Sequence, residues 1–193
     1  MRTLKDTIRD TINLTILESQ EVSLMKQKVE NHIMRVIFFY KKMLQLGLIP
    51  KEDQNLKEVL KHDEDKLLSG NLKNQSKRLQ SKFNNKDYND IADTVGKHIK
   101  TNPHHVEYWD SNAKFGSSRV DCSEMPDKYL YEMIADWHAT AEEKGNSVID
   151  YMENMSWKFK FTDHQQELIR KCAKALKPYI DKSFEKHYED SLY

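Results

Sequence analysis

Apolar residues recur at intervals of three to four along most of the chain, and this spacing predicts amphipathic helices. The first helix is expected over residues 3–18 and the second over about 22–46, where Gly47 supplies a C-terminal stop signal. A third is predicted over about 53–69 and should end at Gly70. The first part of the chain therefore indicates three helices joined by short connections.

The middle of the chain is more polar. Residues 70–87 are rich in Asn, Gln, Ser and Lys, and we interpret them as a long loop with one helical turn around Leu79 and Phe83. A helix follows over about 87–100, with Tyr88 among its inward residues. It should stop at the Asn-Pro pair that comes next, because a residue before proline disfavours helix.

Two further helices complete the prediction. One starts near Pro126, which suits a first helical turn, and runs to Lys144. The last covers about 163–189, where Pro178 should kink or split it. Because no repeat or linker-like segment interrupts the pattern, we expect one all-α domain, a helical bundle spanning residues 1–193.

Composition narrows the class of protein. The 31 Lys and Arg residues balance the 31 Asp and Glu residues, which argues against nucleic acid as the main partner. Cys122 and Cys172 form no disulfide framework, so a reducing compartment is expected. The N-terminus lacks the apolar stretch of a signal peptide, and no run is long enough to span a membrane. We therefore expect a cytoplasmic protein without a membrane partner.

Metal-capable side chains lie at the edges of the apolar stripes in four separate segments. Asp63, for example, falls three residues after Leu60 and four before Leu67. A carboxylate directed at a core is costly unless positive charge meets it. A single such residue is more often structural, but several converging imidazoles and carboxylates suit divalent Zn, Mn, Fe, Co or Ni. The candidate ligands are His32, His62, Asp63, His98, His104, His105 and Asp136.

The order His, His-Asp, Asp resembles the HD-domain superfamily of metal-dependent phosphohydrolases, over the stretch from His32 to Asp136. A second likeness is to an uncharacterised family of short bacterial and phage proteins, so the compartment would be the host cytoplasm for a phage-encoded chain. That likeness is carried by His62-Asp63-x-x-Lys66, Asn102-Pro103-His104-His105-x-Glu107 and Glu132-Met133-x-x-Asp136-Trp137.

The superfamily resemblance implies a metal at the centre of a helical core, here about residues 22–145, with the C-terminal helix outside it. Members with one ion use four ligands, which match His32, His62, Asp63 and Asp136. Members with two ions use two more histidines, which His98 and either His104 or His105 could supply, with the counterpart of Asp63 bridging both ions. We therefore expect one or two divalent ions.

The resemblance also implies hydrolysis of a small phosphate ester or anhydride, with a nucleotide as the leading substrate class. Asp63 would orient or deprotonate the attacking water, and Lys66 would hold substrate phosphate. Glu107 is a candidate general acid or partner of a ligand histidine. Two alternatives stay open: a dinuclear-iron oxygenase that cleaves a C–C or C–P bond, and a non-catalytic helical protein stabilised by its metal. Lys66 and Glu107 could also be ordinary surface residues.

The segment 110–121 is a candidate lid, with Lys114 and Arg119 as its substrate-binding cations, although a plain solvent loop has the same composition. Some remaining side chains have simpler interpretations. Tyr108 and Trp109 are expected to pack in the core, and Trp137 to pack beneath Asp136. The sequence leaves the oligomeric state open, a homodimer included. Surface positions are predicted for His138, His164 and His187.

Overall fold

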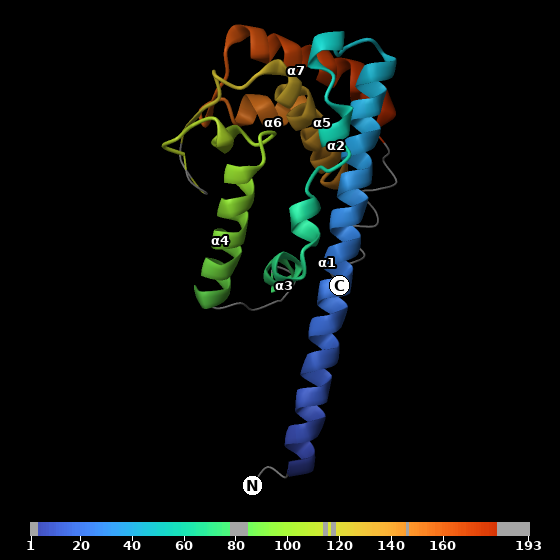
Figure 1. Cartoon of the computed structure of the whole chain (residues 1–193), viewed down its shortest axis with the longest axis vertical. Helices are drawn as coiled ribbons and strands as arrows, with labels where there is room; N and C mark the ends of the chain where they lie inside the picture. Colours follow the sequence, from blue (N-terminus) through green and yellow to red (C-terminus); the bar gives the residue numbers. More distant parts are fainter. Residues whose placement is uncertain (1–3, 78–84, 114–115, 117–118, 146, 181–193) are drawn as a thin grey trace.

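A computed structural model of the chain describes residues 4–77, 85–113, 116, 119–145 and 147–180. This part of the chain is mostly helical, with two short strands, which confirms the predicted all-α, single-domain bundle (Figure 1). The α-helices are α1 (Leu4–Gln45), α2 (Leu56–Val59), α3 (Ser69–Ser76), α4 (Asn85–Thr101), α5 (Asp127–Glu143), α6 (Val148–Asn154) and α7 (Asp163–Leu176). Short 3-10 helices are η1 (Lys51–Asp53), η2 (Glu64–Leu67), η4 (Val106–Tyr108) and η5 (Lys177–Tyr179).

Helix α1 is the longest helix in the described part of the chain and contacts α2, α3, α5 and α7. It is one continuous helix of 42 residues, whereas the sequence predicted two helices with a break near residues 18–22. That stretch holds no glycine or proline, and the hydroxyl of Ser19 bonds the carbonyl of Ile16 within the helix, so nothing interrupts it. The N-terminal half extends beyond the rest of the molecule, and the C-terminal half packs against α5 and α3 (Figure 1). The helix is followed by Gly47 in a left-handed conformation, as predicted.

The main core lies where α1, α5 and α7 meet. Phe39 and Tyr40 of α1, Leu130 and Ile134 of α5, and Ile169 of α7 are fully or almost fully buried there. Burying a side chain of this size stabilises the fold by roughly 1.5–3 kcal/mol. Because α5 is covered on two sides, its polar positions between the apolar ones are also drawn toward the interior. This packing places Asp136 beside α1.

The prediction of one regular helix over residues 53–69 is wrong. The chain instead forms η1, α2 and η2, with turns between α2 and η2. Asp63 takes a left-handed conformation with φ of 57°, which a continuous helix does not allow. Leu60, which the predicted apolar stripe would turn inward, is 48% exposed. The break turns His62 and Asp63 into the interior, where a regular helix would have separated their directions.

Helices α3 and α4 form a second layer beside α1. The predicted loop over 70–87 is wrong at its start, since α3 is helical through Ser76 and contains Gly70. The predicted turn around Leu79 and Phe83 lies outside the described residues. Helix α4 confirms the predicted helix, although Tyr88 is exposed rather than inward.

The C-terminal third adds elements that the sequence did not predict. Two short strands, β1 (Val120–Asp121) and β2 (Phe159–Lys160), pair in parallel, with Val120 opposite Phe159. Helix α6 precedes β2. Helix α7 ends at Leu176, before Pro178 in η5, so the described part of the predicted helix stops where the proline was expected to interrupt it. The remainder of the predicted helix lies outside the described residues. No helix in the described ranges has the length and apolarity needed to cross a membrane.

Candidate metal centre

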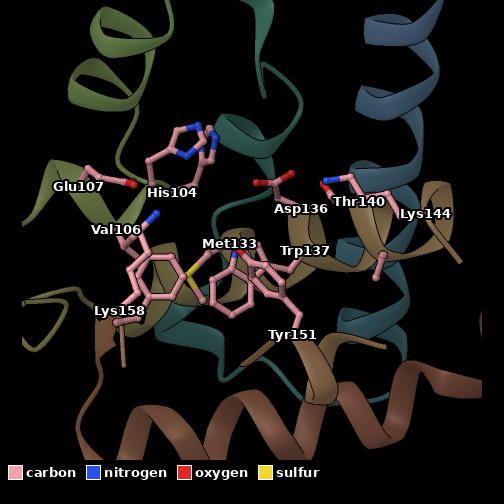
Figure 2. A pocket seen from close by; sticks show the side chains of 13 residues that line it. His104, Val106, Glu107, Met133, Asp136, Trp137, Thr140, Lys144, Tyr151 and Lys158 are labelled. Atoms are coloured by element: carbon pink, nitrogen blue, oxygen red, sulfur yellow. The ribbon is translucent and has the colours of Figure 1, made fainter. Parts of the chain in front are cut away.

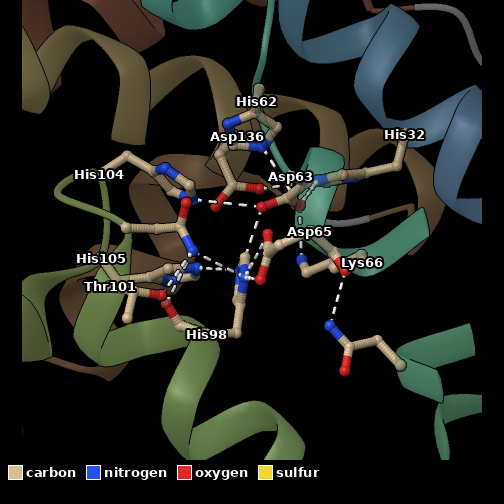
Figure 3. A network of polar contacts seen from close by, with 12 residues as sticks. His32, His62, Asp63, Asp65, Lys66, His98, Thr101, His104, His105 and Asp136 are labelled. Carbon is tan, nitrogen blue, oxygen red and sulfur yellow. Dashed lines mark hydrogen bonds and ion pairs between the residues drawn. The ribbon is translucent and has the colours of Figure 1, made fainter. Parts of the chain in front are cut away.

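The structure brings the seven candidate ligands together at the junction of α1, α4 and α5 (Figure 3). His32 comes from the middle of α1, and Asp136 from the facing side of α5. The turn before η2 supplies His62 and Asp63. His98 lies near the end of α4, and the chain turns after that helix to present His104 and His105. Segments far apart in sequence thus converge on one buried point.

Asp63 occupies the centre of this cluster and is only 1% exposed. Its Oδ2 lies 3.3 Å from Nε2 of His62 and 3.8 Å from Nε2 of His32. Its Oδ1 lies 3.1 Å from Nε2 of His98 and 3.5 Å from Nε2 of His104. Each oxygen of one carboxylate therefore faces its own pair of imidazoles.

The candidate ligand atoms in the described part of the chain form two groups with no residue in common, and a third group of His62, His104 and Glu132 shares one histidine with each of them. In the first, which we name subsite 1, one ligand atom from each of His32, His62 and Asp136 lies within 4.8 Å of the others. In the second, subsite 2, Asp63, His98, His104 and His105 meet the same limit. The Nε2 atoms of His98 and His105 are 2.8 Å apart, so a proton or a shared cation must lie between them. Both groups have the nitrogen and oxygen donors that divalent transition metals use.

An outer set of carboxylates holds the imidazoles in place. Glu132 Oε1 lies 3.0 Å from Nδ1 of His62 and 3.3 Å from Nδ1 of His104. Glu143 contacts Nδ1 of His32 at 2.9 Å, and Asp65 contacts Nδ1 of His98 at 2.8 Å. In each case Nδ1 faces a carboxylate and Nε2 faces the cluster. This is the carboxylate–histidine arrangement that orients metal-binding imidazoles.

These outer carboxylates were missed as functional residues. Glu132 and Glu143 lie four residues before and seven after Asp136, so helical periodicity places all three on one face of α5. That spacing could have identified them from the sequence. Asp65 had no such signal, because its position depends on the irregular chain after Asp63.

Within the described part of the chain, three buried polar atoms of the cluster form no hydrogen bond of good geometry: Nε2 of His62, Nε2 of His104, and Oδ1 of Asp63, which lies 3.1 Å from Nε2 of His98. An unsatisfied buried polar group costs about 1–3 kcal/mol, so three beside one another need a compensating ligand. A divalent cation would satisfy two imidazole nitrogens and a carboxylate oxygen at once. The residues present therefore fit a metal ion.

The electrostatics of the cluster favour a cation. Burial lowers the pKa of His32, but hydrogen bonds to Asp136 and Glu143 outweigh it and raise that pKa to about 10. Burial also opposes a charge on His62, yet Asp63 and Glu132 raise its pKa to about 9. The negative potential that holds a proton on these imidazoles would equally attract a divalent metal, which would displace the proton.

Of the two other predicted catalytic residues, Lys66 contacts the cluster directly and Glu107 lines the cavity beside it. The amine of Lys66 lies 2.5 Å from Oδ2 of Asp63, so this lysine is an ion-pair partner of the cluster rather than a solvated side chain. Burial lowers its pKa, but the charges of Asp63 and Asp136 outweigh burial and raise it. Glu107 is half-buried and lines a cavity next to His104.

That cavity has a volume of about 420 Å³ and reaches the cluster through His104, His105 and Asp136 (Figure 2). Its remaining walls come from η4, α5, α6 and the start of β2. A small molecule could reach the ligands through this cavity, and a smaller one of about 120 Å³ reaches His98, His105 and Lys66 from another side. The other lining residues are Val106, Glu107, Met133, Trp137, Thr140, Ala141, Lys144, Tyr151, Lys158 and Phe159.

The predicted lid is described only in part. Lys114 lies outside the described residues. Arg119 is exposed and is not among the residues that line the cavity. The ends of the segment are tied together, because Asp110 accepts a hydrogen bond from the backbone N–H of Asp121. The structure therefore does not bring Arg119 to the cluster.

Other side chains differ from their predicted positions. His138 is buried rather than on the surface, and burial lowers its pKa to about 4. Tyr108 is exposed rather than in the core. Trp109 packs against the main core, as predicted, and its indole N–H donates a hydrogen bond to the carbonyl oxygen of Pro103. His164 is exposed, as predicted. His187 lies outside the described residues.

Comparison with known families assigns the chain to one of them. It belongs to a family of unknown function, DUF5662, whose pattern matches residues 21–186. This stretch includes every residue of subsites 1 and 2. Comparisons with curated proteins and with solved structures gave no match.

Proposed function

We propose that this protein is a metal-dependent phosphohydrolase of the HD-domain type that uses two divalent ions and acts on a small phosphate ester or anhydride. The observation that carries the proposal is the position of Asp63, whose two oxygens face the imidazoles of His32 and His62 on one side and of His98 and His104 on the other. Asp63 would therefore be among the residues that hold an ion at either subsite. The order of the ligands along the chain supports the same class.

Each residue has a role in this proposal. Metal at the two subsites would supply Lewis acidity and an activated water near neutral pH. Asp63 would orient that water, because its oxygens lie between the subsites. Lys66, held against Asp63, would contribute positive charge beside the reacting phosphoryl group. Glu132 and Glu143 would hold the Nδ1 atoms of the imidazoles, so that each Nε2 is turned toward the metal.

The second candidate is a dinuclear-iron oxygenase that cleaves a C–C or C–P bond. The observation that favours it is the histidine content of subsite 2, where three imidazoles accompany one carboxylate. The same donors serve hydrolysis, so the metal decides between the two. Iron with an optical or paramagnetic signal after aerobic purification would favour the oxygenase.

The test combines metal analysis with an activity assay. The purified protein should contain close to two divalent ions per chain and should release phosphate from a mixed panel of nucleotides and sugar phosphates in the presence of Mn²⁺ or Co²⁺. Asp63→Asn should abolish this release more completely than Lys66→Ala, since Asp63 acts on both the ions and the water. Metal at full occupancy without phosphate release from any of the panel would reject the hydrolase and favour a structural metal.

A further inference from the structure

Two lysines, Lys144 and Lys158, line the cavity beside the metal cluster, together with the carboxylates of Glu107 and Asp136. Lys144 follows the last residue of α5, and Lys158 precedes β2. Neither forms an ion pair with any residue in the described part of the chain, whereas neighbouring Lys160 pairs with Asp121 at 2.6 Å. Cations that face a cavity and lack a carboxylate partner are suited to bind an anionic ligand.

The two lysines lie on different sides of the cavity. Figure 2 shows the amine of Lys144 on the side of Thr140 and Asp136, and the amine of Lys158 on the side of Val106. The Lys158 amine is 5.1 Å from the centre of the Phe159 ring, so it is held over an aromatic face. Lys144 is therefore next to the metal ligand Asp136, and Lys158 lies across the cavity from Lys144.

Between them lies an aromatic wall. The rings of Trp137 and Tyr151 meet edge to face with centroids 5.0 Å apart, and Phe159 lies 5.9 Å from Trp137. Burial, with the nearby charges of Glu107 and Asp136, raises the pKa of Tyr151, so its hydroxyl remains a hydrogen-bond donor near neutral pH. A flat apolar group fits against such a wall, since aromatic surfaces favour stacked or edge-to-face contact.

We propose that this cavity is the substrate pocket, and that its substrate is a small organic phosphate with a planar apolar portion and a second anionic group. The phosphate would face the cluster and Lys144, the planar portion would lie against Trp137 and Tyr151, and the second anion would bind Lys158. The phosphate end rests on the proposed function, while the contacts with Trp137 and Lys158 depend only on the cavity.

Three probes separate these contacts: inorganic phosphate, phenyl phosphate and 4-carboxyphenyl phosphate. Binding is measured by calorimetry on the protein as purified, at a pH where both anions are ionised, after its metal content is recorded. We expect phenyl phosphate to bind more tightly than inorganic phosphate. The carboxylated probe should bind up to about five-fold more tightly than phenyl phosphate, the upper end of the gain from one partly exposed charge pair. Equal affinity for all three probes, or no binding at all, would overturn the proposal.

Lys158→Met should remove the preference for the carboxylated probe and leave the affinity for phenyl phosphate nearly unchanged. The matched control is Lys160→Met, two residues along the same segment, which should retain the preference. Trp137→Leu should weaken both aromatic probes but not inorganic phosphate. A Lys158→Met protein with the wild-type preference would overturn the assignment. Because affinity and phosphate release are measured separately, selective binding without hydrolysis would reject the proposed phosphohydrolase and leave the substrate pocket standing.

Discussion

The amine of Lys66 lies 2.5 Å from Oδ2 of Asp63, the oxygen that faces subsite 1. Lys66 and the metal ions would therefore compensate the same buried negative charge. If Lys66 is changed to Met, Asp63 loses its nearest fixed positive charge. Without metal, this change should cost about 1–3 kcal/mol, as for a buried group that loses its partner. With metal bound, the cost should be smaller.

The measurement is the thermal midpoint of wild type and Lys66→Met in excess chelator and in saturating Zn²⁺ or Mn²⁺. The stabilisation by metal should be larger in the variant. Lys61→Met, at an exposed lysine on the same turn, serves as the control and should respond as wild type does. Equal metal stabilisation in wild type and Lys66→Met would contradict this electrostatic relationship.

Glu132 is expected to control metal affinity without touching the metal. Its carboxylate contacts Nδ1 of both His62 and His104, and these bonds lower its own pKa to about 2 despite burial. Glu132→Gln keeps the shape but removes the charge, so affinity at both subsites should fall by about 10–100-fold. Competition with a fluorescent chelator measures the change. Glu124→Gln, at an exposed glutamate, should leave affinity unaltered, and a Glu132→Gln protein with wild-type affinity would exclude the role.

Periodicity predicted most of the longer helices, although it divided α1 into two and missed α3 and α6. The stripes of α4 and α5 were predicted with nearly the observed bounds, because each helix buries one continuous face. His138 shows where the reading of a stripe failed. It lies four residues after Ile134 and four before Glu142, on a face covered from α1, but its polar sequence neighbours suggested the surface. For His138, helical periodicity was a better guide to burial than the polar residues beside it in the sequence.

The irregular parts of the fold and some residues of the site depend on tertiary contacts that leave no local pattern in the sequence. The left-handed conformation of Asp63 follows from burial of the cluster, and a propensity argument cannot foresee it. Lys158 reaches the cavity because the β1–β2 pairing brings its segment beside η4. Residues of that kind become visible only after distant segments have been placed together.

A buried ion pair away from the cluster should dominate the stability of α1 against α5. Arg35 donates from Nε and from a terminal nitrogen to the two oxygens of Glu142, each at 2.5 Å, and the Glu142 side chain is 0% exposed. Arg35→Ala would leave that carboxylate without its main partner and should cost about 3–5 kcal/mol. Urea unfolding measures the difference. The control, Lys26→Ala, breaks an exposed pair with Glu30 and should cost less than about 0.5 kcal/mol, so similar losses in both variants would contradict the prediction.

The two cysteines should be unreactive while the protein is folded. Both are buried, and burial raises the pKa of each thiol to about 12. The thiolate is the reactive form, so alkylation by iodoacetamide at pH 8 should be slower than in urea by roughly a hundred-fold or more. Mass spectrometry after timed quenching measures both rates, and the folded-state rate should rise with pH. Rapid labelling of either cysteine in the native protein would show that the local packing opens.

The two-subsite arrangement makes a prediction about stoichiometry that does not depend on activity. His32→Ala removes a ligand from subsite 1, and His98→Ala removes one from subsite 2. Each variant should lose about one ion per chain, because the other subsite keeps its own imidazoles. Metal analysis after dialysis, with folding checked by circular dichroism, measures the loss. His164→Ala is the matched control, since His164 is an exposed histidine whose partner is Asp127, and its metal content should equal that of wild type. If His98→Ala retained the full content while His32→Ala lost all of it, one mononuclear site built on subsite 1 would replace the two-ion arrangement.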